Sequence, residues 1–259
     1  MLRLTVLGSC GTFPGPGRAC SGYLLEGGER GGRPWRVWVD TGSGTLANLL
    51  RHAPLLDVDA IWVSHLHADH CTDLPVAYYT MRYGGMAPER PLPVFGPTGW
   101  HEHMCNFLTA DGPRDMRDMF EVHELHDGED IGLGGLRLTA IATEHSVETY
   151  GVRASDGGRT LAYSADSGPC DALVQLGRDA DLFLCEAAWM QRPPDNRLIH
   201  CTPAEAGERA ALARARKLVL THVRPDCDRQ DVVEQAAKAF GGKVGFALEG
   251  DVYEFGDDL

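Results

Sequence analysis

Short runs of hydrophobic residues, separated by glycine, proline and polar residues, extend along most of the chain. The runs are rich in Val, Leu, Ile and aromatic residues and end at turn-forming residues, which is the pattern of β-strands. The predicted strands are Leu2–Leu7, Tyr23–Leu25, Trp35–Val39, Ala60–Ser64, Pro93–Phe95, Leu136–Ala142, Gly151–Ala154, Thr160–Ser164, Leu182–Cys185, Lys217–Thr221, Val244–Ala247 and Val252–Phe255.

Segments with helical patterning lie between these strands. One begins at Thr202-Pro203-Ala204-Glu205, where threonine suits the cap position, proline the first turn, and an acidic residue follows early. The predicted helices are Thr45–His52, Leu74–Tyr83, about Asp115–Phe120, Asp171–Leu176, Ala204–Ala213 and Arg229–Phe240. Because strands and helices do not alternate strictly, we expect two packed sheets with helices outside, and not a parallel barrel.

The chain of 259 residues shows no internal repeat and no low-complexity tract, so we expect a single domain over residues 1–259. No run approaches the length of about 18 apolar residues that a membrane-spanning helix needs. The opening residues 1–8 are too short an apolar stretch for a secretion signal. We therefore expect a cytoplasmic protein without a membrane partner.

The net charge is −13, from 24 basic and 37 acidic residues. Clustered cations hold nucleic acids, so this charge argues against stable nucleic-acid binding. It still allows a small anionic substrate at a locally positive site. The eight cysteines include no Cys-x-x-Cys pair, so we expect reduced thiols and neither a disulfide framework nor a cysteine metal site.

The residues that indicate chemistry begin in Ser64-His65-Leu66-His67-Ala68-Asp69-His70, directly after the apolar run 60–63. Composition alone would produce this spacing roughly 0.002 times per chain, so the motif is specific. In a tight turn, His65 and His67 would point one way while Asp69 and His70 point another. The spacing therefore predicts two adjacent metal sites.

Four more residues of metal-ligating type each follow a predicted strand. They are Asp40, His145, Asp166 and His222. Ligand sites in open sheets form outside the carboxyl ends of strands, so we expect these side chains to meet the histidine cluster.

This ordered set resembles the five motifs of the metallo-β-lactamase superfamily, over nearly the whole chain from about Leu4 to Tyr253. The resemblance implies an α/β fold, the four-layer αββα sandwich, with a binuclear and usually zinc centre. The ligands that it implies are His65, His67 and His145 for the first ion, Asp69, His70 and His222 for the second, and Asp166 between the two. Asp40 matches a residue that supports the site by hydrogen bonding.

The donor types fit this assignment, since imidazole and carboxylate suit zinc, with manganese or iron as alternatives. Two ions about 3.5–4 Å apart can hold a hydroxide as nucleophile and neutralise developing charge. Asp69 is placed both to ligate and to orient that nucleophile.

The segment after Asp166 indicates which branch of the superfamily the chain resembles. Asp181-Leu-Phe-Leu-Cys-Glu186, His200 and Leu218-Val-Leu-Thr-His222 are similar to ribonuclease Z and its small-molecule relatives. There a glutamate supports a histidine close to the scissile phosphate. The resemblance thus implies catalytic roles for Glu186 and His200.

One feature of the chain departs from ribonuclease Z and favours its small-molecule relatives. Those enzymes usually carry a long arm that grips transfer RNA, often between the motifs of His145 and Asp166. Here only 166 − 145 = 21 positions separate them, and the chain has three lysines. The armless, acidic pattern resembles bacterial members that hydrolyse cyclic nucleotides. We therefore predict a binuclear phosphodiesterase for a small phosphodiester, such as a 3′,5′-cyclic nucleotide.

Three alternatives stay open at this point: transfer-RNA 3′-processing, hydrolysis of an ester, thioester or lactone on the same metals, and a metal-stabilised binding module. The relatives are often dimers, which suggests a homodimer. The aromatic residues of segment 78–120 suit either a core or a lid over the substrate.

Overall fold

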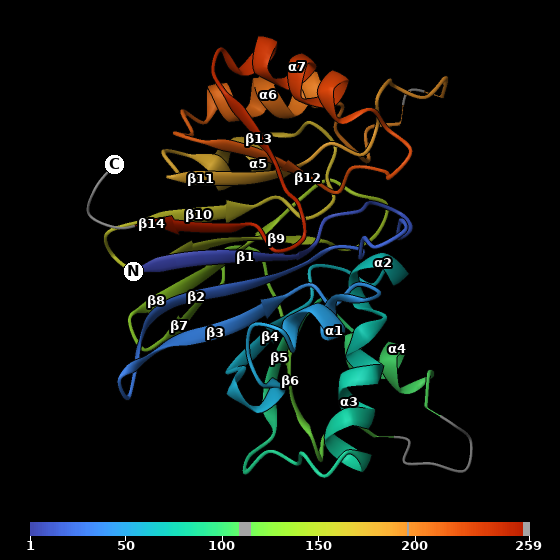
Figure 1. Cartoon of the computed structure of the whole chain (residues 1–259), viewed down its shortest axis with the longest axis vertical. Helices are drawn as coiled ribbons and strands as arrows, with labels where there is room; N and C mark the ends of the chain where they lie inside the picture. The colour runs from blue at the N-terminus through green and yellow to red at the C-terminus, as the bar shows by residue number, and fades with distance from the viewer. Residues whose placement is uncertain (109–114, 196, 256–259) are drawn as a thin grey trace.

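The computed structural model describes residues 1–108, 115–195 and 197–255, which form two mixed seven-stranded sheets packed face to face (Figure 1). The first sheet has the order β14-β1-β2-β3-β4-β5-β6, antiparallel as far as β3 and parallel from there on. The second has the order β13-β12-β11-β10-β9-β8-β7, parallel from β13 to β10 and antiparallel beyond. The two sheets therefore repeat one arrangement.

The first sheet contains β1 (Leu2–Gly8), β2 (Gly22–Arg30), β3 (Arg33–Val39), β4 (Ala60–Trp62), β5 (Leu92–Gly96), β6 (Phe120–Glu124) and β14 (Val252–Phe255). The second contains β7 (Asp130–Leu133), β8 (Leu136–Ala142), β9 (Tyr150–Ser155), β10 (Thr160–Tyr163), β11 (Leu182–Glu186), β12 (Leu218–Thr221) and β13 (Val244–Phe246). The helices are α1 (Thr45–Leu49), α2 (Ala68–Cys71), α3 (Asp73–Tyr83), α4 (Trp100–Cys105), α5 (Asp171–Gly177), α6 (Pro203–Leu212) and α7 (Arg229–Phe240), with a 3-10 turn at Leu55–Asp57.

Three apolar clusters hold the layers together. The largest lies between the sheets and includes Leu4, Trp62 and Leu184. A second packs α1, α3 and α4 on the outer face of the first sheet, and a third packs α5, α6 and α7 on the second (Figure 1). Successive side chains of a strand point alternately to the cluster between the sheets and to the cluster beneath the helices, because each sheet packs against one cluster on each of its faces. The result is the predicted αββα sandwich.

All twelve predicted strands are present, but the prediction missed β6 and β7, and the short helices α2 and α4. The helix predicted over Asp115–Phe120 is wrong: a turn precedes Phe120, where β6 begins. Met116, Met119 and Phe120 are buried, so the spacing that suggested a helix is satisfied by a turn packed on the core.

Burial shows whether two aromatic residues of segment 78–120 belong to the core or to a lid. Tyr78 and Trp100 are fully buried in the cluster beneath α3 and α4, so they belong to the core. Residues 109–114 of the segment lie outside the described part. All eight cysteines are described and none of them forms a disulfide. In the described ranges no helix has the length and apolar character to cross a membrane.

Candidate metal centre

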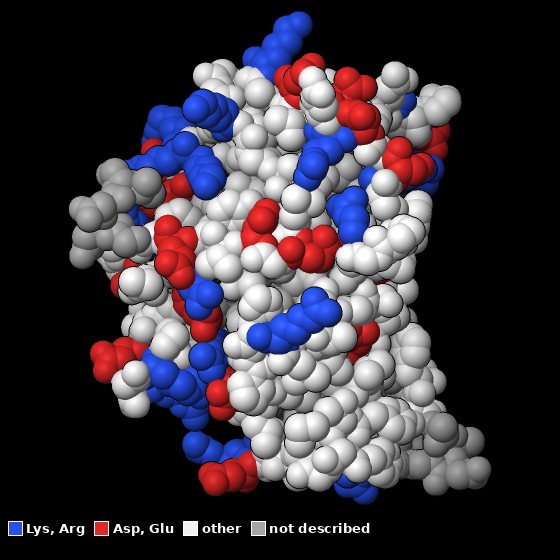
Figure 2. Space-filling model, in the orientation of Figure 1, with Lys and Arg blue, Asp and Glu red and all other residues white. Residues whose placement is uncertain are grey.

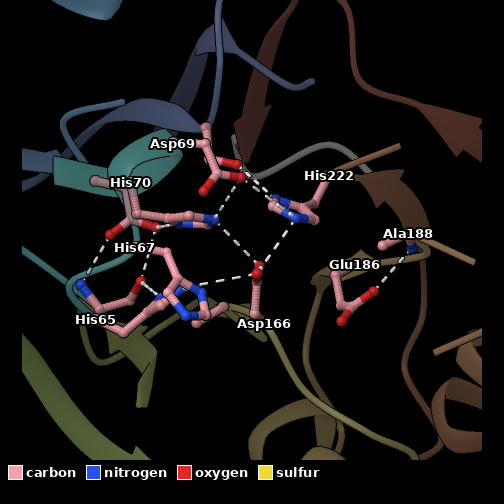
Figure 3. Close-up of polar contacts among 12 residues, drawn as sticks. His65, His67, Asp69, His70, Asp166, Glu186, Ala188 and His222 are labelled. Carbon is pink, nitrogen blue, oxygen red and sulfur yellow. Dashed lines mark hydrogen bonds and ion pairs between the residues drawn. The ribbon is translucent and has the colours of Figure 1, made fainter. Parts of the chain in front are cut away.

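The predicted site residues meet at one edge of the sandwich, where carboxyl ends of strands from both sheets come together (Figures 1 and 3). From the first sheet, His65 and His67 follow β4, and Asp69 and His70 lie in α2. From the second sheet come three more side chains, which follow β8, β10 and β12: His145, Asp166 and His222. The histidine motif therefore meets residues distant in sequence, as predicted.

The backbone at this edge adopts a conformation that non-glycine residues seldom take. Asp40, Ala165 and His222 have φ of 55°, 53° and 53°, in the left-handed region, and Thr12 beside them has φ of 67°. Each such residue costs on the order of 1–3 kcal/mol and persists only where its surroundings fix it. Asp40, Ala165 and His222 follow the ends of β3, β10 and β12. The sharp change of chain direction there turns the side chains of Asp40, Asp166 and His222 towards the centre.

The first group of facing atoms consists of three histidine nitrogens. His67 Nδ1 lies 3.1 Å from His65 Nε2 and 3.1 Å from His145 Nε2. In a tetrahedral zinc site with Zn–N distances of 2.0–2.1 Å, neighbouring nitrogens are about 3.3 Å apart. The two distances from His67 Nδ1 are thus close to those of a zinc site.

The second group shares Asp166 with the first. Asp166 Oδ1 lies 3.2 Å from His70 Nε2, and Asp166 Oδ2 lies 3.2 Å from His222 Nε2. The same Oδ2 is 3.6 Å from His65 Nε2. Asp69 Oδ2 lies 3.7 Å from the Nε2 atoms of both His70 and His222. Asp166 therefore stands between the two groups (Figure 3).

The remaining ring nitrogens are fixed by partners outside the centre. His70 Nδ1 donates to Asp40 Oδ2 at 2.7 Å, and His145 Nδ1 donates to the carbonyl of Ile199 at 2.7 Å. His222 Nδ1 is 2.9 Å from Ser21 Oγ. Such contacts set the tautomer and leave Nε2 free as a metal donor.

Asp40 has the supporting place that the sequence indicated. Its carboxylate accepts hydrogen bonds from the Ser64 amide at 2.8 Å, the Ser64 hydroxyl at 2.9 Å and the Tyr163 hydroxyl at 2.7 Å, besides the one from His70. Asp40 is fully buried, so its carboxylate oxygens are satisfied by these donors and not by water.

The electrostatics differ among the donors: burial would lower the pKa of His70, but the charges of Asp166 and Asp40 raise it well above its usual value. Burial lowers the pKa of His65, His67, His145 and His222, which favours the unprotonated form that ligates metal. Burial would raise the pKa of Asp166, but the surrounding histidines, His222 first, hold it well below its usual range. Asp166 is therefore an anion inside the site.

A divalent ion fits this donor set. His70 Nε2 and Asp166 Oδ1 are buried, and apart from their own ion-pair contact at 3.2 Å neither atom has a hydrogen-bond partner among the described residues. Buried polar atoms are normally satisfied, so these two call for a shared partner. Metal-type groups form around them: one of His65, His67, His145 and Asp166, one of Asp69, His70 and His222, and one of Asp166, His200 and His222, with ligand atoms within 4.8 Å.

Glu186 and His200 form a pair beside the centre. Glu186 is fully buried at the end of β11, and its carboxylate accepts from the amides of Ser167 and Ala188, each at 2.9 Å. Figure 3 shows the bond from Ala188. His200 Nδ1 donates to Glu186 Oε1 at 2.8 Å. Burial would lower the pKa of His200, but the charge and hydrogen bond of Glu186 raise it to about 9.

Sequence reasoning did not find several partners of these residues. Ser21, Tyr163 and Ile199 contact His222, Asp40 and His145, and nothing in their own residue types marked them. Thr12 lies in the glycine-rich stretch that follows β1. Its amide donates to Asp69 Oδ2 at 2.7 Å, so this stretch contacts a residue of the centre.

The fold and the centre together define a metal-dependent hydrolase with a metallo-β-lactamase fold. Residues 35–223 match the family described as the beta-lactamase superfamily domain, and the chain belongs to that family.

Comparison with individual proteins agrees with this assignment. An uncharacterized protein of Mycobacterium tuberculosis is 38% identical over 256 residues, which cover 98% of this chain and 92% of that protein. The probable metallo-hydrolase YhfI of Bacillus subtilis is 29% identical over 98% of this chain and 100% of its own. Its crystal structure superposes with a TM-score of 0.83, covering 97% of this chain and 98% of that one. The ribonuclease Z of Methanosarcina acetivorans is 27% identical over 93% of this chain and 94% of its own.

Proposed function

We propose that the protein is a phosphodiesterase for a small phosphodiester, such as a 3′,5′-cyclic nucleotide. In this proposal His65, His67 and His145 hold one divalent ion, preferably zinc, while Asp69, His70 and His222 hold a second and Asp166 bridges them. Bound ions would activate water and neutralise charge on the phosphoryl group.

The observation that carries the proposal is the Glu186–His200 pair. Hydrolysis of a phosphodiester releases an alkoxide, which needs a proton as its bond to phosphorus breaks. His200 has its Nδ1 committed to Glu186 at 2.8 Å, and the ring lies against His145 with centroids 4.9 Å apart. Nε2 is therefore the nitrogen left to donate to the leaving oxygen.

Asp69 has the complementary task on the other side of the reacting phosphorus. The amide of Thr12 holds Asp69 Oδ2 at 2.7 Å, which fixes the carboxylate towards His70 and His222. From there it would orient the attacking water and accept its proton. In sum, water adds to phosphorus, the ester bond breaks, and His200 protonates the departing oxygen.

Transfer-RNA processing is the second candidate, because one relative is named ribonuclease Z. Two observations favour a small substrate. The span between His145 and Asp166 contains only the antiparallel strands β9 and β10, joined by a short turn (Figure 1). On the face seen in Figure 2, basic and acidic side chains are interspersed, without the single-sign band that suits a polyanion.

An activity panel tests the proposal. Zinc- and manganese-loaded protein would be assayed with cyclic AMP, bis-p-nitrophenyl phosphate, a lactone, a thioester and a 3′-extended transfer RNA. We expect hydrolysis of the first two, lost in Asp166→Ala. Turnover of only the lactone and thioester would overturn the proposal, and cleavage of only the transfer RNA would favour the second candidate. Total inactivity of the metal-loaded protein across the panel would leave a binding module.

A further inference from the structure

Phe13 is presented beside the centre by an unusual turn. The amide of Phe13 donates to the carbonyl of Gly11 at 2.8 Å, across Thr12 with its φ of 67°. A three-residue turn of this hand is rare and strained, above all for a β-branched residue such as threonine. The strain is held in place because the Thr12 amide bonds to Asp69. Phe13, which follows Thr12, is therefore held in a fixed position relative to the centre.

Two further contacts define the position of Phe13. The preceding Gly11 donates to the carbonyl of Val223 at 3.3 Å, so the turn lies along the segment that follows His222. The succeeding Pro14 restricts Phe13 to an extended backbone. Phe13 has 42% of its surface exposed, so its ring is accessible to a ligand. The turn thus displays an aromatic ring that packing does not require.

Arg224 lies against the Phe13 ring and also lines a neighbouring cavity. The Arg224 guanidinium carbon lies 5.9 Å from the centroid of Phe13, and its Nε donates to Asp226 at 3.0 Å, which offsets its charge. Arg224 and Trp189 both line a cavity of about 570 Å³. The Trp189 ring lies 5.1 Å from that of His200. Arg224 therefore links Phe13 to the rim of this cavity, and Trp189 links the same cavity to His200.

We propose that Phe13, supported by Arg224, is the platform on which the flat nucleobase of the substrate stacks. This inference rests on the proposed phosphodiesterase function and specifies the substrate class as a nucleotide. The phosphate would lie at the charged centre. The uncharged base would stack on the Phe13 ring, beside the Arg224 guanidinium, whose charge is paired with Asp226. Stacking of this kind tolerates any base, so the platform selects for a base and not for its identity.

The test compares two substrates that differ only in the base: adenosine 3′,5′-cyclic phosphate and 1-O-methylribose 3′,5′-cyclic phosphate. We expect Phe13→Ala to raise KM for the first by about 5-fold or more, the lower range for loss of one base–aromatic stack. Its kcat should stay near that of the unchanged protein, as should both constants for the second substrate. Phe13→Trp should restore KM, since the larger ring stacks at least as well.

Phe107→Ala is the matched control, because Phe107 is also an exposed phenylalanine, with 52% of its surface exposed, and it follows α4, which supplies none of the proposed site residues. It should leave both substrates unaffected. Equal losses on both substrates in Phe13→Ala, or failure of Phe13→Trp to restore KM, would overturn the platform. If the unchanged protein hydrolyses neither phosphodiester, the proposed function itself has failed, which is a separate result.

Discussion

His200→Ala tests the chemistry of the leaving group. The change removes the ring whose Nδ1 bonds to Glu186 at 2.8 Å and whose Nε2 is assigned to the leaving oxygen. Glu186 keeps its bonds from the amides of Ser167 and Ala188, so the buried carboxylate still has donors after the change. We therefore expect the folded state and the metal content to persist.

The size of the loss follows from the role of the proton. General acid catalysis contributes about 10²–10⁴-fold, or roughly 3–5 kcal/mol in the activation free energy. A ribose alkoxide is a poor leaving group and should show the full loss. A p-nitrophenolate is stable without protonation, so turnover of its diester should fall by less than about 10-fold.

The assay measures kcat for cyclic AMP and for bis-p-nitrophenyl phosphate in both proteins, with metal content determined on the same samples. Equal losses on the two substrates would refute proton donation and leave His200 as a phosphate-positioning residue. Loss of metal would instead make His200 a ligand, as its place near Asp166 and His222 allows.

Three further predictions concern the metals and the fold. Metal analysis of saturated protein should find about two divalent ions per chain, and Asp166→Ala should weaken both sites together; a stoichiometry that stays at one would contradict the bridge. Asp69→Asn should lower kcat at least about 10²-fold, because an amide is a poorer ligand and cannot accept a proton; near-normal turnover at full metal content would remove Asp69 from the mechanism. Asp228→Ala should lower the free energy of unfolding by about 1 kcal/mol in urea titrations and leave kcat unchanged, because the Asp228 side chain caps α7 by accepting from the amides of Gln230 and Asp231; an unchanged denaturation midpoint would show that the cap contributes nothing.

The sequence revealed the centre because its ligands are chemically distinctive and stand at strand ends. The spacing of His65, His67, Asp69 and His70 required a turn, and the structure supplies it as the start of α2. Capping residues were equally readable: the sequence indicated Thr202 as the cap of α6 with an early acidic residue, and in the structure Thr202 and Glu205 form a reciprocal cap. Such features are local, so one stretch of chain contains the whole signal.

What the sequence missed depends on distant parts of the chain. β6 carries charged and aromatic residues in Phe120–Glu124 and becomes a strand because it pairs along β5. Ser21 and Tyr163 are ordinary strand-end residues until folding places them against His222 and Asp40. Nothing within their own segments distinguishes them from other buried polar residues.

The two sheets contribute donors to a single cluster, with His70 from the first facing Asp166 from the second. An ion held between them would be a cross-link between halves of the molecule, and its binding energy would become part of the folding energy. At a free metal concentration about 1,000 times the dissociation constant, this linkage adds about 4 kcal/mol per site. Resistance to heat and to proteases would then depend on how much divalent metal the surroundings supply.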